Sequence, residues 1–515
     1  MSRTSQAPAA AGQETALSGG ALWLAAFALA AANFVAVLNL TLANVAVPHI
    51  AGSLGAAASQ STWVITAYAV GEAMTVPLTG WLASRFGAVR VFSIAMALFG
   101  LFSLACGLSP SLGVLVVARI LQGLCGGPLM PLSQTLLMRI FPKEKVGSAI
   151  GMWSMTTLVA PVLGPLLGGW LCDNYSWHWV FVLNAPFAVL FAVFAWNLLK
   201  RYTEPLTKNG IDAVGLGLLV IWVGALQLML DEGKDLDWFS SGIVVALAAV
   251  TVVGFVAFII WELNDKNPIV DLRVFRHRGY SVAVLTLSLT YAAYFGVNVL
   301  TPQWLQTYMG YTAFQSGMAT AGTGLASFLM APLVTRLSAK FDKRALVFYG
   351  VIWLGLMTLW RSVATTDMAF ANIALPLATM GLALPFFFMP TTQLALASVG
   401  PSEMASGAGL MSFIRTLSGA FATSVVTTSW SDRITSNHAE LVGLVDSSTQ
   451  TMLSQAGMTA DAALQAVDNL VTGQSVMLAT NQMMAIIGVA FLLAGFFIWL
   501  APKAERAIDP AAGGH

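Results

Sequence analysis

The chain has 515 residues, of which 57% are hydrophobic and only 9% charged. Ordinary globular domains contain about 25% charged residues, so this composition excludes a soluble protein and indicates a polytopic membrane protein. The net charge of +1 gives no reason to expect nucleic acid as a partner, and the 3 cysteines have no spacing typical of a disulfide framework or a zinc site.

The first 20 residues are rich in Ala, Gly and Ser and predict a disordered tail. The apolar run that follows is too long, and too lacking in a cleavage pattern, for a removable signal peptide. A helix needs about 20 apolar residues to cross the hydrocarbon core. Scanning the chain with that length predicts fourteen transmembrane spans, at 21–43, 61–82, 89–108, 112–136, 146–171, 179–199, 211–230, 241–262, 280–301, 314–335, 345–363, 370–396, 404–430 and 478–500.

The basic residues predict the orientation of these spans. Most of the 24 Lys and Arg fall in one set of alternating loops and in the two tails, whereas the other set holds Lys234, Arg361 and Arg433. Cytoplasmic loops carry the excess of basic residues. Both termini are therefore expected in the cytoplasm, and the long polar segment 431–477 outside it.

The first span contains three amides, Asn33, Asn39 and Asn44, and no charge. Asn33 and Asn44 are close to three helical turns apart and share a face, while Asn39 points away from both. Amides inside bundles line cavities or bridge helices, and the sequence leaves both roles open.

Glu72 is an acidic residue deep inside a span, roughly 15 Å from its start at 1.5 Å per residue. On a helix it shares a face with Tyr68, Thr75 and Thr79. A charge at bilayer depth costs about 2.5–3.5 kcal/mol even on insertion scales, so it persists where it is paired or has a function. We interpret Glu72 as a candidate proton carrier; the alternative is a paired or permanently protonated residue that only packs helices.

Two arginines also lie inside spans and are candidate partners for Glu72. Arg119 has Gln122 and Gly123 on the next helical turn, and Arg415 lies among small polar residues. Both helices are expected to turn these faces inward. Either arginine could instead cap backbone carbonyls at a kink.

Aromatic residues form a further cluster in the ninth span. Tyr291, Tyr294 and Phe295 could line a cavity for hydrophobic compounds, as could the triplet 386–388. Such residues can equally face lipid or pack between helices.

Two glycine-rich motifs indicate close helix packing. "GWLASRFGAVR" (80–90) is a tight turn with Gly80 and Gly87, and its basic residues Arg85 and Arg90 lie at the membrane surface. "APVLGPLLGGW" (160–170) contains Gly164, Pro165 and Gly168; Gly164 and Gly168 let a neighbouring helix approach, and proline interrupts the helical ladder.

In order along the chain, these two motifs, "ARILQGLCGGP" (118–128) and "WHWVFVLNAPF" (177–187) resemble the signatures of the major facilitator superfamily. Together with fourteen spans, they resemble its fourteen-span drug/proton antiporters of the EmrB type. The resemblance implies an all-α polytopic membrane protein with two six-helix bundles and two extra central helices. The implied divisions are a tail at 1–20, bundles at 21–200 and 267–502, the inserted pair at 201–266 and a tail at 503–515.

Two positions depart from the family pattern. Ser84 stands where the loop motif usually has an acidic residue, and Asn39 stands where relatives carry a membrane aspartate. An amide cannot titrate, so the usual proton carrier of the first span is missing. Glu72, in the neighbouring span, is expected to serve instead.

The function implied by the resemblance is proton-coupled efflux of hydrophobic or amphiphilic drugs across a bacterial inner membrane. EmrB-type pumps work with a periplasmic adaptor and an outer-membrane channel, so segment 431–477 is a candidate contact site or, alternatively, a solvated lid. A proton-coupled exporter of one metabolite or fatty-acid-like compound is the second reading. No phosphate-binding loop, catalytic triad or metal-ligand cluster is apparent, so we expect no enzyme, cofactor or metal.

Overall fold

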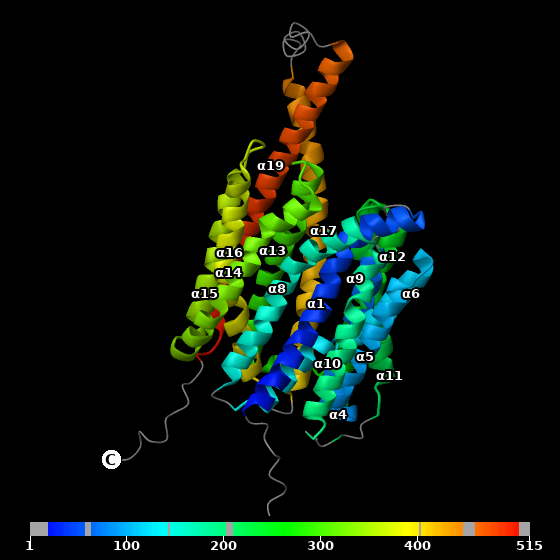
Figure 1. Ribbon diagram of the computed structural model, residues 1–515, viewed down its shortest axis with the longest axis vertical. Helices are drawn as coiled ribbons and strands as arrows, with labels where there is room; N and C mark the ends of the chain where they lie inside the picture. The colour runs from blue at the N-terminus through cyan, green and yellow to red at the C-terminus, as the bar shows by residue number, and fades with distance from the viewer. Residues whose placement is uncertain are drawn as a thin grey trace, which may run out of the picture.

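The computed structural model describes residues 19–56, 63–142, 145–201, 206, 210–400, 403–445 and 459–503. The tails predicted at 1–20 and 503–515 lie almost wholly outside these residues. All the regular elements of the described residues are helices, as the apolar composition predicts. Figure 1 shows the helices standing side by side with their long axes roughly vertical.

The helices fall into an N-terminal set, an inserted pair and a C-terminal set. The N-terminal set is α1 (Gly20–Leu54), α3 (Trp63–Thr75), α4 (Thr79–Phe86), α5 (Ala88–Gly107), α6 (Leu112–Gly126), α7 (Leu129–Ile140), α8 (Val146–Asn174), α9 (His178–Val182) and α10 (Asn184–Leu199). The inserted pair is α11 (Ala213–Glu232) and α12 (Gly242–Asn264), with η1 (Trp238–Ser240) between them. The C-terminal set is η2 (Leu272–Arg276), α13 (Arg278–Thr307), α14 (Ala313–Lys340), α15 (Lys343–Trp360), η3 (Arg361–Val363), α16 (Phe370–Ala397), α17 (Met404–Leu444), α19 (Ala460–Phe497) and η4 (Ile498–Leu500).

In the described part of the chain, 12 helices are long and apolar enough to cross a membrane. A thirteenth span, α8, qualifies when its two parts, which are bent by 42°, are taken together. The predicted second span divides into α3 and α4, of 13 and 8 residues, and each alone is too short. Pro77 lies at the break. Its ring removes a backbone donor, which interrupts the helix at this point. These helices cover the fourteen predicted spans.

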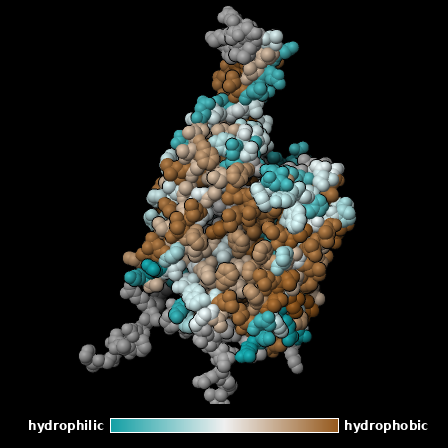
Figure 2. Space-filling view, in the orientation of Figure 1, coloured by the Kyte–Doolittle hydropathy of each residue, from teal (hydrophilic) through white to brown (hydrophobic). Residues whose placement is uncertain are grey.

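Packing follows the expected two-bundle plan. In the N-terminal bundle, α1 packs on α8 and α10, and α3 packs on α6; in the C-terminal bundle, α14 and α15 pack on α16, and α13 on α17. The bundles meet where α8 packs on α14, and α11 packs on both α3 and α17. On the face shown in Figure 2, hydrophobic residues form a broad band across the body, with hydrophilic residues toward both ends.

The helices α17 and α19 are much longer than a membrane is thick. They contain 41 and 38 residues, or about 60 Å at 1.5 Å per residue, against a hydrocarbon core of about 30 Å. Figure 1 shows both projecting beyond the body of the protein. The sequence prediction of a loop is therefore wrong for 431–444 and 460–477, which are helical; 446–458 lie outside the described residues.

Contacts between the two helices explain this extension. Arg433 donates to Gln482 Oε1 at 2.9 Å, and Trp430 Nε1 donates to Thr480 Oγ1 at 3.0 Å. Thr459 caps the start of α19. Apolarity alone identifies only the lipid-spanning part of such helices, because the polar continuation is stabilised by pairing rather than by lipid.

Candidate functional site

Arg119, on α6, is a completely buried cation (0% exposed). Its Nε donates to Val64 O at 2.8 Å, and its Nη1 donates to Gln122 Oε1 at 2.8 Å. Its guanidinium carbon lies 4.4 Å from the ring centre of Tyr68 and 5.5 Å from that of Phe181. Its Nη2 has no hydrogen-bond partner among the described residues. Neutral groups from neighbouring helices thus hold this charge.

Asn39 belongs to the network of Arg119. Gln122 Nε2 donates to Asn39 Oδ1 at 3.3 Å, and Asn184 Nδ2 donates to the same oxygen at 3.0 Å. Asn39 is 0% exposed, and its Nδ2 finds no acceptor within the described chain. The amide therefore links α1, α6 and α10 through neutral hydrogen bonds.

Glu72 lies on α3 at a place where α6 approaches unusually closely. A methyl group on Gly123 would collide with Tyr68 O and lie 3.0 Å from Glu72 N, and one on Gly127 would lie 2.9 Å from Glu72 O. Only glycine allows these backbones to meet, so the glycines of "QGLCGGP" fix the height and rotation of Glu72.

The Glu72 carboxylate is half-buried and makes no ion pair with a described residue. The charges of Arg415 and Arg119 both act on it. Arg119 belongs to the N-terminal bundle and Arg415 to the C-terminal bundle. The structure thus brings together the three charged residues that the sequence singled out.

Arg415 lies on α17 and is 5% exposed. Its guanidinium carbon lies 5.5 Å from the ring centre of Tyr291 and 5.8 Å from that of Phe388, and its Nη2 contacts the sulfur of Met130 on α7. Met130 is in the other bundle, so Arg415 spans the interface between the halves.

The three aromatic candidates of α13 lie in two different places. Tyr291 and Phe295 stack with ring centres 5.7 Å apart, and both rings border Gly419 on α17. Tyr291 thereby joins the Arg415 side of the site. Tyr294 packs against the apolar core instead, and its carbonyl accepts a hydrogen bond from Asn298 at 2.8 Å.

The other two amides of the first span have different surroundings. Asn33 is 0% exposed and donates to Thr156 Oγ1 at 3.1 Å and Thr157 Oγ1 at 2.8 Å, so it bridges α1 and α8. Asn44 is exposed at the surface.

The turn at 80–90 packs against the other bundle. A methyl group on Gly80 would collide with Ser406 on α17. Gly87 has φ +88°, a conformation that favours glycine, and it both ends α4 and begins α5. Arg85 is half-buried and Arg90 is exposed. Gly80 therefore packs against the opposite bundle, and Arg90 lies at the surface.

The glycines of α8 face α1. A methyl group on Gly164 would collide with Thr41 Oγ1, and one on Gly168 would lie 3.4 Å from Leu42. Pro165 lies between the two parts of α8 that are bent by 42°. The predicted close approach of a neighbouring helix is thus present, and the neighbour is α1.

Sequence reasoning missed three residues of this site, which are Met130, Phe181 and Asn184, whereas Phe388 belongs to the aromatic triplet that it named. Asn184 carries a signal, because it is an amide within an apolar span. Met130 and Phe181 resemble the many other apolar residues of their helices, so nothing in the sequence separates them.

In this arrangement, the charges of two buried arginines from opposite bundles act on one carboxylate. Arginine keeps its proton in proteins, so Glu72 is the one of these three side chains that could change its charge. Protonation of Glu72 would remove an attraction that acts on Arg415 across the interface. A change of this kind favours one packing of the bundles over another.

The chain matches the family model described as Major Facilitator Superfamily over residues 29–423. It is 41% identical to the multidrug export protein EmrB of Escherichia coli K12, covering 98% of this chain and 100% of that protein. The chain belongs to the Major Facilitator Superfamily. It is also 39% identical to the fatty acid resistance protein FarB of Neisseria gonorrhoeae, with 97% and 99% coverage.

Solved structures of the superfamily share the fold. The proton:xylose symporter XylE superposes with a TM-score of 0.58 at 14% identity and covers 94% of this chain and 96% of its own. At this identity the likeness concerns the architecture alone. The chain is thus an EmrB-type, multi-pass membrane protein of a transporter family.

Proposed function

We propose that this protein exports hydrophobic or amphiphilic compounds in exchange for protons. The likeness to EmrB over nearly its whole length supports the export of several compounds. The observation that carries the proton coupling is the position of Glu72, a half-buried carboxylate on which the charges of Arg119 and Arg415 act. Exchange of a compound for a proton then requires one side chain. This side chain gains a proton when the site opens to one side of the membrane and loses it when the site opens to the other.

Competition at this residue provides the coupling. When Glu72 is ionised, its carboxylate attracts Arg415 of the opposite bundle and can attract a cationic or polarised compound. When it is protonated, neither attraction remains, and the bundles are free to rearrange. Drug and proton thus bind different states of the same site, which is the differential affinity that coupling needs.

Glu72→Gln in proteoliposomes tests this proposal. The amide keeps the shape of the side chain but cannot titrate, so the variant should bind substrate, lose substrate-induced proton release and lose gradient-driven export. Glu440→Gln, at an exposed position on α17, is the matched control and should behave as the original protein. Gradient-driven export by Glu72→Gln at the original rate would rule out the role of Glu72.

Export of a single fatty-acid-like compound or metabolite is the second candidate. The likeness to FarB favours it, and Arg415 offers a guanidinium that could hold a carboxylate. A panel of cationic, neutral and carboxylate compounds in the same proteoliposomes separates the two. Export of only one chemical type would favour this candidate.

We infer that the protein lies in a bacterial inner membrane with both termini in the cytoplasm. The basic residues concentrate in the loops on that side, in keeping with the rule for cytoplasmic loops. Single-cysteine labelling in intact cells tests the orientation: a cysteine in the hairpin of α17 and α19 should react with an impermeant reagent, whereas one near residue 503 should not.

We also propose that the projecting hairpin of α17 and α19 contacts a periplasmic adaptor that leads to an outer-membrane channel. Leu464 and Leu470 of α19 lie on the projecting part and are 58% and 62% exposed. Replacing both with Glu should abolish adaptor capture and reduce efflux. Glu at the neighbouring exposed positions Gln465 and Asn469 is the control and should have no effect; intact capture by the leucine variant would contradict the proposal.

A further inference from the structure

A buried and a half-buried carboxyl group lie together outside the central site, where α11 begins and α12 ends. Asp212 caps the start of α11, and its Oδ1 accepts from Gly215 N at 2.8 Å. Glu262, in the last turn of α12, is 1% exposed, and its Oε2 accepts from Val270 N at 3.2 Å. The proposed function gives these residues no role.

The two carboxyl groups face the same small space. A methyl group built on Gly215 would collide with Asp212 Oδ2 and would also meet Glu262 Oε1 at 2.5 Å. Glu262 Oε1 is buried and has no hydrogen-bond partner among the described residues. Trp261 Nε1 donates to both oxygens of Asp212 at 3.0 Å, so this side chain is held in place.

Within the described residues, the other charges near Glu262 do not offset this pair. Asp212 and Asp265 are the charged side chains there that act on Glu262, and both are acidic; residues 202–205 and 207–209 lie outside the described part of the chain. Arg273, the nearby base on η2, directs its Nη2 to the carbonyl of Asp265 at 2.7 Å. Two carboxylates that face each other without a cation between them cannot both ionise at low cost, and such pairs retain a proton.

We propose that Glu262 keeps its proton and donates it in a hydrogen bond to Asp212, and that this contact is a proton-binding site on the inserted helices. The two side chains together then carry a single negative charge. Removal of the proton to water as the pH rises leaves two negative charges at this contact, which repel each other and separate the end of α12 from the start of α11.

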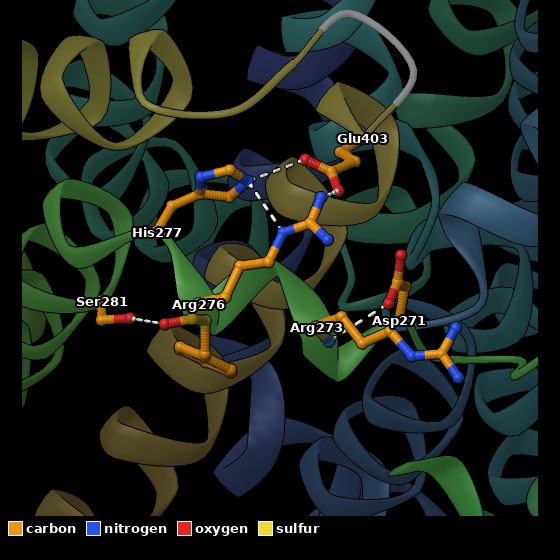
Figure 3. A network of polar contacts seen from close by, with 7 residues as sticks. Asp271, Arg273, Arg276, His277, Ser281 and Glu403 are labelled. Carbon is orange, nitrogen blue, oxygen red and sulfur yellow. Dashed lines mark hydrogen bonds and ion pairs between the residues drawn. The ribbon is translucent and has the colours of Figure 1, made fainter. Parts of the chain in front are cut away.

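The pair is connected to the C-terminal bundle through residues 265–277, which we call the strap. Glu262 holds the strap at Val270. At the other end of the strap, Arg276 Nη2 lies 2.5 Å from Glu403 Oε1 and His277 Nε2 lies 3.0 Å from Glu403 Oε2, at the start of α17 (Figure 3). Loss of the Glu262 proton should therefore loosen the strap.

The sign of the pH effect follows from the proton count. The folded protein holds a proton that the two separated carboxyl groups of the unfolded chain lack at neutral pH. Stability falls with rising pH wherever the folded state binds more protons. Stability should therefore fall as the pH rises from the ordinary carboxyl pKa, about 4, through the pH at which this proton is lost, and should not change further above it.

The first experiment measures thermal unfolding and amide hydrogen exchange of the full chain in lipid nanodiscs from the ordinary carboxyl pKa, about pH 4, to alkaline pH. The original protein should lose stability, and exchange in the strap should rise beyond its intrinsic dependence on pH. Glu262→Gln can donate to Asp212 and still accept from Val270 N, and Asp212→Asn keeps the helix cap. Both variants should remove most of this pH dependence, whereas Glu440→Gln should keep it.

Infrared spectroscopy provides a direct second measurement, made in a Glu72→Gln background so that the central carboxyl group contributes nothing. A protonated-carboxyl band should be present at neutral pH, disappear at alkaline pH and be absent in both the Glu262→Gln and Asp212→Asn variants. A missing band, or a pH dependence unchanged in both variants, would overturn the proposal. Because this background lacks Glu72, neither result depends on the proposed transport mechanism.

Discussion

Gln122 donates a hydrogen bond to Asn39 at 3.3 Å, and the same Gln122 accepts one from Arg119. Asn39 therefore occupies the position of a counter-charge to Arg119 without carrying a charge. Because Asn184 donates to the same oxygen of Asn39, a carboxylate at this position would find two donors already in place.

We expect Asn39→Asp to restore part of the gradient-driven export in a Glu72→Gln background. The new carboxylate would be a titratable group inside the Arg119 network. The measurement is substrate-driven proton release in proteoliposomes. Asn33→Asp is the control, since Asn33 binds threonines of α8 instead, and it should restore nothing; equal recovery by both variants would show that position within the network is unimportant.

Arg119→Ala should fold but export poorly, by at least about tenfold, which corresponds to about 1.4 kcal/mol. Arg119→Lys should recover only part of the rate, because an ammonium group cannot satisfy both Val64 O and Gln122 Oε1 in the planar geometry of a guanidinium. Initial export rates are compared with the thermal midpoint of each variant. Full export by the alanine variant would mean that Arg119 has a structural role alone.

Gly123→Ala should destabilise the protein by about 1–3 kcal/mol, because the added methyl group collides with the backbone of α3. Gly113→Ala, on the same helix with nothing within 4 Å of the new Cβ, should be neutral or stabilising by up to about 1 kcal/mol. Chemical denaturation in detergent compares the two. A similar loss in both would contradict the prediction, because contact with Glu72's helix would then not set the cost.

The ion pair between Asp342 and Arg344 predicts that the folded protein loses stability at acidic pH. The hydrogen bond from Arg344 lowers the pKa of Asp342, which lies between α14 and α15. A group with a lowered pKa stabilises the folded state above its ordinary pKa of about 3.9, and this contribution disappears as the pH falls through the folded value. Asp342→Asn should remove this contribution, about 0.5–1 kcal/mol for a partly exposed pair, and flatten the acid side of the stability profile; an unchanged profile would contradict it.

The sequence predicted the spans well because lipid imposes a long apolar run on each helix; the orientation inferred from charge placement stays a prediction. It singled out Glu72, Arg119 and Arg415 because a charge at bilayer depth is conspicuous in a chain with 9% charged residues, and their roles stay predictions. It could not predict that Asn39 contacts Gln122, because this depends on the rotation of two helices that are far apart in sequence.

The projecting helices were missed for a related reason. Thr459 and the helix-forming residues after it favour a helix, but a search for apolar runs passes over "ADAALQAVDNLVTG". Likewise, Asp212 and Glu262 read as ordinary acids at the ends of spans. Only the close approach of α11 and α12 at Gly215 brings their oxygens to the same space.

The unbroken helix α17 carries Glu403 beside its first residue, Arg415 near the middle of the membrane and Leu444 at its far end. A helix without a break moves as one stiff rod, so a small tilt at Arg415 becomes a larger sideways displacement at the distant tip. Under the proposed coupling, the charge state of a single carboxylate in the membrane would thereby produce movement well outside the membrane, at the tip where we propose that a partner binds.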